Sequence, residues 1–235
     1  MNKPLNKKET IIILVCAITI ILSVVIFFVI RTINANSSSF KFNEHLKENV
    51  ITITPAANQD SSTTLSCNVS LKELSYYVLV CEANVNNTAY LYNPNNTNSY
   101  WNLYISNTFM KTIAKDTCMS MCQRDNIYYL EALKNNYSLN SEEEKLVLDE
   151  AAYIYENLTG KQVDATNLTI EDLYNIRYKI SLVSKYIKHL TDEDNYSTEA
   201  LNVNGDYYTT ICKTYTIDVD NVWDNVTLGN ITIDR

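Results

Sequence analysis

The sequence predicts a mainly α-helical protein that begins with one transmembrane helix. Gly and Pro occur only three times each in 235 residues, too few for the many tight turns of an all-β fold. Apolar residues recur at intervals of three or four along most of the chain beyond residue 70, as they do in amphipathic helices. An unbroken apolar run fills residues 11–30.

The apolar run has the length of a membrane span. At a rise of about 1.5 Å per residue, its 20 residues match a hydrocarbon core about 30 Å thick. A secretory signal peptide has a shorter apolar region and a cleavage site of small residues, and we find no such site. We therefore expect an uncleaved anchor at 11–30, with late cleavage as the alternative.

Lysines set the expected orientation of this anchor. Three of them lie within residues 3–8, so the positive-inside rule places residues 1–10 in the cytoplasm as a short tail. Residues 31–69 are then a tether with one short strand, and residues 70–235 are a helical ectodomain on the extracytoplasmic side of the cell membrane. Because a ten-residue tail is too short for a kinase or another output module, we expect the function to reside in the ectodomain.

The composition argues against several classes of partner and reaction. With a net charge of −8 and no basic stripe, the surface is not expected to attract nucleic acid or anionic lipid headgroups. The sequence has no Gly-rich phosphate loop, nucleophile elbow, H-E-x-x-H motif or EF-hand loop. The acidic clusters at 142–144 and 192–194 suit helix capping and solvation better than metal binding or acid–base catalysis. We expect no enzymatic activity, no cofactor and no metal.

Five cysteines fall in the expected ectodomain, so at least one of them should be unpaired. They are Cys67, Cys81, Cys118, Cys122 and Cys212. Cys118 and Cys122 share a helix face at i, i+4 spacing, but no second Cys or His pair is spaced to complete a metal site. We interpret this pair as small buried residues.

The first elements follow from local patterns. Residues 50–54, Val-Ile-Thr-Ile-Thr, alternate as a strand does, and the polar run after residue 58 is typical of a loop. Ser70 and Glu73 form a capping-box pattern that predicts a helix from about residue 71 to 84, and the Asn-rich segment 92–98 breaks the chain. Apolar spacing from Trp101 to Cys122 then predicts one long helix, continuing or kinking near Asp125 into residues 127–133.

Two further helices are expected to form a hairpin. Residues 141–144, Ser-Glu-Glu-Glu, combine a capping box with acidic residues at the positive end of the helix dipole, and Gly160 suits the C′ position. Thr169 is the expected N-cap of the next helix. The expected buried stripes are Leu146, Ala151, Ile154, Tyr155 and Leu158 in the first helix, and Leu173, Ile176, Ile180, Val183, Ile187 and Leu190 in the second.

The C-terminal part completes the expected domain. The apolar residues from Leu201 to Cys212 are compatible with a last helix, and residues 215–219 alternate as a strand does. Trp223, Val226 and Leu228 are expected to pack this strand down.

The order of elements from Ser70 to Leu190 resembles the SurA-like N-terminal chaperone domain of bacterial extracytoplasmic foldases. That domain is related in architecture to the substrate-binding domain of trigger factor and to the PrsA foldases. The residues that carry the resemblance are the first helix 71–85, the aromatic segment 98–102, the helix end 125–132, the helix start 137–144 and the closing helix 168–187.

In many such foldases the closing helix leads into a parvulin-type prolyl isomerase domain. The short stretch between Leu190 and Tyr215 cannot hold such a domain, and neither His45 nor His189 lies in the expected context of a parvulin site. The resemblance therefore implies a membrane-anchored, ATP-independent chaperone that holds unfolded or secreted polypeptides, without prolyl isomerase activity. The alternative is a structural or scaffold subunit that binds one fixed partner in a secretion or envelope complex. The sequence specifies no oligomeric state.

A holder of unfolded chains needs adaptable apolar side chains on its surface, and Tyr and Trp suit this role. The candidate peptide-binding residues are Tyr76, Tyr77, Tyr100, Trp101, Tyr104, Tyr128 and Tyr129, together with Phe109. Core packing is the competing interpretation for each, and most of all for Trp101 and Phe109. Because adjacent residues on a helix point in different directions, we expect one member of each Tyr-Tyr pair to be exposed.

Overall fold

The structure, a computed structural model, describes residues 40–57 and 65–233. The expected cytoplasmic tail and the expected anchor at 11–30 lie outside these residues. Within the described part of the chain, no helix is both long enough and apolar enough to cross a membrane. Far more of the described residues lie in helices than in strands, which confirms the prediction of a mainly α-helical fold. From Phe42 onward the chain forms one compact unit.

A three-stranded antiparallel sheet joins the two ends of this unit. Its strands are β1 (Asn49–Pro55), β2 (Cys67–Ser70) and β5 (Tyr215–Val219), in the order β2-β1-β5. Ile53 of β1 lies opposite Cys67 on one side and Ile217 on the other. The strands predicted at 50–54 and 215–219 are therefore confirmed, whereas β2 was not predicted. A short 3-10 helix, η1 (Phe42–Glu44), precedes the sheet.

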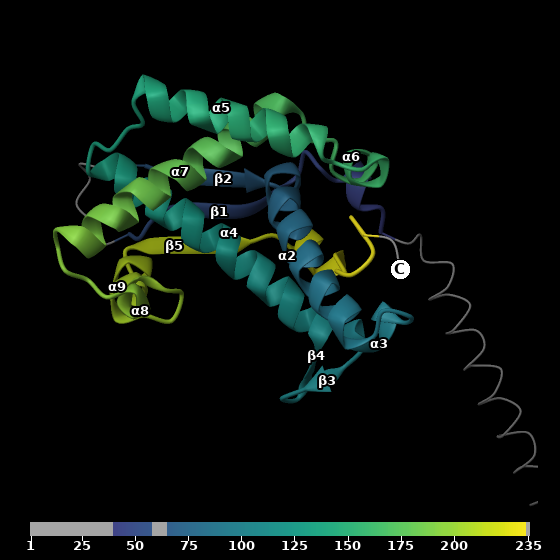
Figure 1. The fold of residues 1–235 in the computed structure, drawn as a ribbon. Helices are drawn as coiled ribbons and strands as arrows, with labels where there is room; N and C mark the ends of the chain where they lie inside the picture. The colour runs from purple at the N-terminus through teal and green to yellow at the C-terminus, as the bar shows by residue number, and fades with distance from the viewer. Residues whose placement is uncertain (1–39, 58–64, 234–235) are drawn as a thin grey trace, which may run out of the picture. The chain divides into compact units, whose positions relative to one another are not determined.

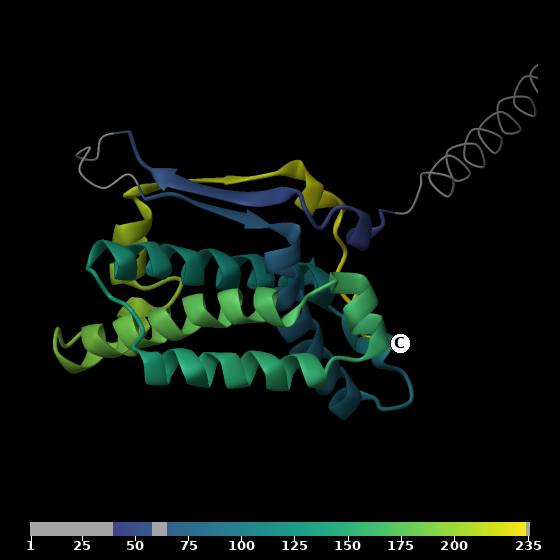
Figure 2. The ribbon, with the colours of Figure 1, turned by 90° about the horizontal axis from the view of Figure 1, so that it is seen from above.

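Four long helices lie on one side of the sheet. They are α2 (Leu71–Tyr92), α4 (Met110–Lys134), α5 (Ser141–Glu156) and α7 (Ile170–Asp192). Figure 2 shows the sheet as one layer with α4, α7 and α5 stacked in turn beneath it, and α2 running from the sheet across them. The packed pairs are α2 with α4, α4 with α7, and α5 with α7. The predicted hairpin of two capped helices is therefore confirmed as α5 and α7.

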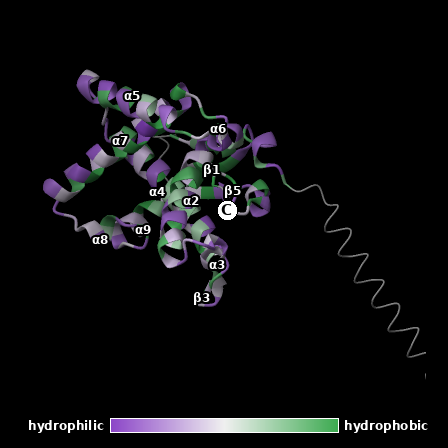
Figure 3. Cartoon of the chain, turned by 45° about the vertical axis from the view of Figure 1, so that its right-hand side comes forward, coloured by the Kyte–Doolittle hydropathy of each residue, from purple (hydrophilic) through white to green (hydrophobic). Residues whose placement is uncertain are grey.

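Shorter elements connect these helices and end the chain. They are α3 (Thr97–Trp101), β3 (Tyr104–Ile105), β4 (Thr108–Phe109), α6 (Gly160–Thr166), α8 (Thr198–Leu201), α9 (Asp206–Cys212) and η2 (Asn221–Asn225). The core lies where the sheet meets the helices, and Figure 3 shows apolar residues in green at β1 and α2. Ile51, Val69 and Leu74 are fully buried there. Trp223, Val226 and Leu228 are also buried, as predicted.

Side-chain caps fix where the helices begin. Ser70 accepts a hydrogen bond from the Glu73 backbone N–H at 3.2 Å and starts α2, and Thr169 forms a capping box with Asp172 at the start of α7. The box expected at Ser141 lies one residue earlier, because the Asn140 side chain accepts from the N–H groups of the first turn. A side-chain acceptor at the N-cap satisfies amides that the helix itself leaves unpaired.

Several predicted boundaries are wrong. The helix expected to begin near Trp101 begins at Met110 instead, because the β3–β4 hairpin takes up the preceding residues. Ser106 and Asn107 have φ angles of 49° and 67°, which the two-residue turn of such a hairpin requires. The helix α4 then continues past Asp125 without a break, which is one of the two forms expected there. The helix α2 extends beyond the expected end at residue 84 to Tyr92.

The end of α5 also differs from the prediction. Gly160 is not a C′ residue, because α5 ends at Glu156 and Gly160 is the first residue of α6. The side chain of Leu146, expected in the buried stripe, is 63% exposed, and its neighbour Val147 is buried in its place. The buried stripe of α7 agrees better with the prediction, since Leu173, Val183 and Leu190 are buried.

Candidate polypeptide-binding surface

Half of the candidate residues lie in the core. Trp101 and Tyr128 have no exposed surface, and Tyr77 and Tyr76 are only 2% and 9% exposed. The expectation that one of Tyr76 and Tyr77 is exposed is therefore wrong. The reason is that α2 is covered from two directions at this point. Arg177 of α7 donates to the Tyr76 hydroxyl at 3.3 Å, and the Tyr77 hydroxyl donates to Asp125 of α4 at 3.1 Å.

In the second tyrosine pair, Tyr128 lies in the core and Tyr129 is half-buried. The Tyr128 hydroxyl donates to the carbonyl of Leu201 at 2.8 Å, which ties α4 to α8. Tyr129 is half-buried, and the Lys179 ammonium lies 5.6 Å from its ring centre. Burial raises the pKa of Tyr129 above its ordinary value. These contacts give both rings structural roles.

Tyr100, Tyr104 and Phe109 lie together at one end of the helical layer. With the last turn of α2 they form a surface that we call the aromatic tip. The aromatic tip consists of Tyr90, Leu91, Tyr92, Tyr100, Tyr104, Ile105 and Phe109. Tyr104 is 61% exposed, and Phe109, which we expected to be the more buried of the candidates, is 44% exposed. In Figure 1 the β3–β4 hairpin projects beyond the end of α4.

Two ring contacts join four side chains of the aromatic tip in pairs. The rings of Tyr104 and Phe109 pack edge to face across the hairpin, with centres 5.0 Å apart. The rings of Tyr92 and Tyr100 lie 5.5 Å apart and join the end of α2 to α3. The buried Trp101 anchors α3 from below. The aromatic tip therefore presents two packed ring pairs beside a buried anchor, Trp101.

The aromatic tip is also free of ionic side chains. Residues 83–110 contain no Asp, Glu, Lys, Arg or His, although charged residues make up 20% of the whole chain. Lys111 follows directly, and its ammonium lies 5.5 Å from the centre of the Phe109 ring. A ligand that contacts the aromatic tip therefore meets aromatic and aliphatic groups and neutral amides from this segment, with the Lys111 ammonium beside Phe109 as a charge at its edge.

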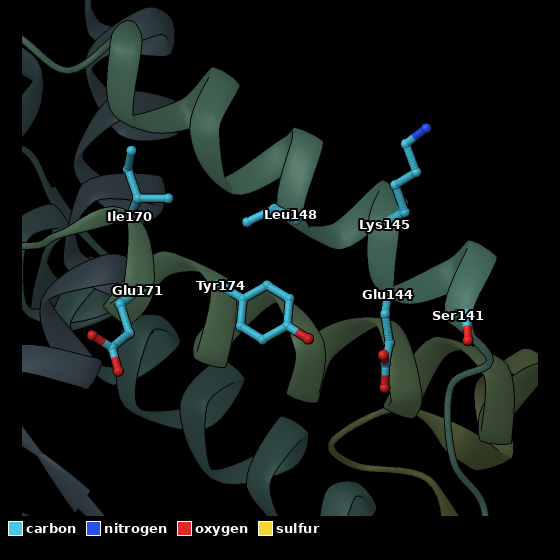
Figure 4. Close-up of a pocket in the computed structure, with 7 residues that line it drawn as sticks. All are labelled: Ser141, Glu144, Lys145, Leu148, Ile170, Glu171 and Tyr174. Carbon is cyan, nitrogen blue, oxygen red and sulfur yellow. The ribbon is translucent and has the colours of Figure 1, made fainter.

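A second exposed apolar region is an open groove between α5 and α7. Its volume is about 510 Å³, and its lining residues are Ser141, Glu144, Lys145, Leu148, Ile170, Glu171 and Tyr174. Figure 4 shows Leu148, Ile170 and Tyr174 between the two helices, whereas Lys145 points away from α7. Leu148 is 49% exposed and Ile170 39%. None of the predicted peptide-binding residues lies here.

The sequence of α5 indicates an exposed apolar surface at this groove. Residues 146–148, Leu-Val-Leu, are three consecutive apolar residues, and a helix cannot turn all three toward the same core. At least one of them must face outward, and Leu146 and Leu148 both do.

A polar cluster lies deeper, where α2, α4 and α7 meet. Lys179 forms an ion pair with Glu73 at 2.7 Å and donates to Asn126 Oδ1 at 3.2 Å, and the Cys67 thiol donates to the same oxygen at 3.1 Å. Burial alone lowers the pKa of Lys179, but the Glu73 carboxylate and the neighbouring thiols together raise it above its ordinary value.

This cluster lacks an activated nucleophile. Burial raises the pKa of the Cys67 thiol, and the opposing effect of Lys179 is smaller. A thiol with a raised pKa is mostly protonated at neutral pH, whereas the thiolate is the nucleophile. Within residues 40–57 and 65–233, no group of three or more His, Cys, Asp or Glu side chains is placed to hold a metal ion. We therefore assign the cluster a structural role.

The chain matches no protein-family model, and no curated protein or solved structure matches it. The resemblance to the SurA-like chaperone domain therefore stays a prediction from the sequence. Functional proposals for this protein rest on its exposed surfaces.

Proposed function

We propose that this protein is a membrane-anchored, extracytoplasmic chaperone that holds unfolded secreted polypeptides without ATP and without isomerase catalysis. The observation that carries the proposal is the aromatic tip, an exposed apolar surface within a segment that has no ionic side chain. The resemblance of the helical order to SurA-like and trigger-factor-like domains supports the same function.

The chemistry of the aromatic tip suits unfolded chains as ligands. Unfolded segments differ in charge but share exposed apolar side chains, so a neutral aromatic surface can bind many of them. Tyrosine offers a large apolar face with few rotatable bonds and a hydroxyl that can bond to peptide groups. Because the surface is small and open to solvent, binding to it should be weak and reversible, as repeated capture and release require.

The groove between α5 and α7 favours the alternative, a scaffold subunit with one fixed partner. Its apolar residues lie beside Glu144 and Glu171, and charged groups beside an apolar contact select one partner over others. The two functions predict different residues for the binding surface, which makes them separable by mutation.

Aggregation suppression tests the proposal. Full-length protein in detergent micelles is mixed at equimolar ratio with each of two unrelated proteins that aggregate on heating, and light scattering is followed without ATP. The proposal expects suppression of both clients, and loss of suppression in the Tyr104→Ser, Phe109→Ser double variant. Tyr153→Ser is the matched control, since Tyr153 is 68% exposed on α5, outside the aromatic tip.

Two results would overturn the chaperone proposal. One is wild-type protein that suppresses neither client, which would favour the scaffold. The other is a double variant that suppresses aggregation as well as the Tyr153→Ser control does, which would remove the aromatic tip as the binding surface.

A further inference from the structure

The groove between α5 and α7 is apolar along its middle. Leu148 of α5 and Tyr174 of α7 lie together there, and Ile170 lies one turn before Tyr174. The Tyr174 ring also lies 6.2 Å from the ring of Tyr178, one turn further along α7. Because the three α7 residues are spaced four apart, they share one helix face and form a row about two turns long. The groove volume of about 510 Å³ lies in the range of ligand-binding sites, about 300–1,000 Å³.

A carboxylate lies near each end of this apolar middle. In Figure 4, Glu171 lies beside Ile170 at one end of the groove. Glu144 lies beyond Tyr174, toward the other end. Of the lining residues, only Lys145 carries a positive charge, and its side chain points away from α7. The groove therefore presents negative charge on both sides of an apolar centre.

These two carboxylates have no partner within residues 40–57 and 65–233. The side chains of Glu144 and Glu171 form neither an ion pair nor a hydrogen bond there, although the carboxylates directly beside them in the sequence do. Glu143 pairs with Lys185 at 2.8 Å. Asp172 pairs with a lysine of α2 at 2.6 Å. The two carboxylates of the groove thus remain available to cations of a ligand.

We propose that this groove binds a basic amphipathic helix of a partner protein. Its apolar side chains cover the middle of the groove, and a Lys or Arg lies near each of the carboxylates of Glu144 and Glu171. An amphipathic helix laid into an apolar groove is a common mode of peptide recognition, with anchors three or four residues apart. The two carboxylates repel acidic segments and the phosphates of nucleic acid and anionic lipids. The inference does not depend on the chaperone proposal, because no residue of the groove belongs to the aromatic tip.

The apolar and charged parts of the groove have different effects on binding. Leu148 and Ile170 are 49% and 39% exposed, so a ligand helix that covers them removes apolar surface from water. Ion pairs at an exposed site add little affinity, but like charges placed together discriminate strongly against a wrong partner. We therefore expect the affinity to depend on the apolar contact and the choice of partner to depend on the carboxylates.

Fluorescence anisotropy with a synthetic peptide tests the proposal. The probe is a fluorescein-labelled helical peptide of alanine and glutamine, with a pair of leucines one turn apart and a lysine one turn beyond each leucine. Full-length protein is titrated in micelles of an uncharged detergent, and empty micelles are the blank. We expect saturable binding that weakens as salt is added. A peptide with glutamates for the lysines, and one with alanines for the leucines, should each bind on the order of tenfold more weakly.

Two leucines of α5 provide a matched pair of variants. Leu148→Ala should weaken binding of the leucine–lysine peptide by on the order of tenfold, because the contact of one leucine side chain is lost. Leu146→Ala should change it by less than about twofold. Leu146 is 63% exposed on the same helix but does not line the groove.

Two pairs of glutamates separate the groove from the overall charge of the protein. The double variant Glu144→Gln, Glu171→Gln should weaken binding by on the order of fivefold, since it removes both ion pairs with the peptide. The double variant Glu142→Gln, Glu156→Gln changes the net charge equally outside the groove and should have less than about a twofold effect. Glu142 lies in the first turn of α5, as Glu144 does. Circular dichroism checks that each variant keeps its helices.

Four results would overturn the proposal. The first is wild-type protein without saturable binding, and the second is a groove variant that binds as well as its matched control. The third is equal binding of the glutamate peptide, which would mean that the groove holds apolar segments of any charge. The fourth is loss of binding in the Tyr104→Ser, Phe109→Ser variant, which would place the peptide on the aromatic tip. Because that variant should otherwise bind as the wild type does, peptide binding and aggregation suppression report on separate surfaces.

Discussion

The buried carboxylate of Glu82 holds the C-terminal segment through Thr232. Its Oε2 atom accepts hydrogen bonds from both the backbone N–H and the hydroxyl of Thr232, each at 2.6 Å. Its Oε1 atom accepts from the N–H groups of Gly229 and Ile231. Glu82 has no exposed surface, so these four donors replace the water that its charge would otherwise require.

Replacing this carboxylate should destabilise the protein. In Glu82→Gln one oxygen becomes an NH₂ group, which cannot accept the two hydrogen bonds that this oxygen receives in the wild type. We expect the free energy of unfolding to fall by about 3 kcal/mol, the cost of leaving buried donors unpaired and losing charge-assisted bonds. Urea unfolding followed by circular dichroism measures it. Glu156→Gln, at an exposed position on α5, is the control and should change stability by less than about 0.5 kcal/mol. Equal effects of the two changes would show that the contact with Thr232 contributes nothing.

Trp101 and Tyr104, three residues apart, should lose very different amounts of stability on truncation. Trp101→Ala removes a fully buried ring beneath α3, and we expect a loss of about 4 kcal/mol in stability. Tyr104→Ala removes a ring that is 61% exposed, and we expect a loss below about 1 kcal/mol, limited to its contact with Phe109. Thermal unfolding of both variants compares them. A large loss from Tyr104→Ala would mean that the aromatic tip is a structural element.

Removing one charge of the Lys179–Glu73 ion pair should lower the stability of the protein more than removing both charges. Lys179→Met leaves the Glu73 carboxylate without its cation among α2, α4 and α7, and we expect a loss of about 3 kcal/mol. The double variant Glu73→Gln, Lys179→Met removes both charges and should recover part of that loss. A double-mutant cycle in urea measures the coupling, and strictly additive effects would contradict it.

Asp172 should make stability depend on pH in the acid range. Burial alone raises the pKa of Asp172, but hydrogen bonds from Lys72 and Thr169 outweigh this and lower it below its ordinary value. A carboxyl with a lowered folded-state pKa stabilises the protein above its unfolded pKa of about 4, and the stabilisation is lost as pH falls through the folded pKa.

Asp172→Asn isolates the charge, since the amide oxygen can still accept from Thr169. Its stability deficit relative to wild type should be full at neutral pH and should shrink as pH falls below about 4. Urea unfolding at a series of pH values measures the difference. A deficit that is constant with pH would mean that the cap and not the charge of Asp172 is responsible.

The sequence predicted those elements that local chemistry decides. The start of α7 was predictable because Thr169 and Asp172 can complete a capping box without help from the rest of the chain. The β3–β4 hairpin was not, because its turn at Ser106 and Asn107 lacks the glycine that usually marks such a turn. The aromatic spacing from Trp101 to Phe109 also fits a helix, so the periodicity was misleading.

The candidate surface was predictable only in part. Tyr100 and Tyr104 were among the predicted residues, and the structure places both on the aromatic tip. Tyr76 and Tyr77 were indistinguishable from them in the sequence, since their burial depends on helices that contribute Arg177 and Asp125 from distant positions. Residues 90–92 were missed because the end of α2 was expected before them.

The strand order β2-β1-β5 sets a sequence of events during synthesis. The central strand β1 is made early, but the partner for one of its edges, β5, is made only after every helix of the helical layer. Until residue 219 has been added, β1 has an open edge beside the apolar residues Ile51 and Ile53. An open apolar edge can pair with another chain. Nascent chains that are cut short before Tyr215 should therefore aggregate, because β5, which is translated after the helical layer, protects β1, which is translated before it.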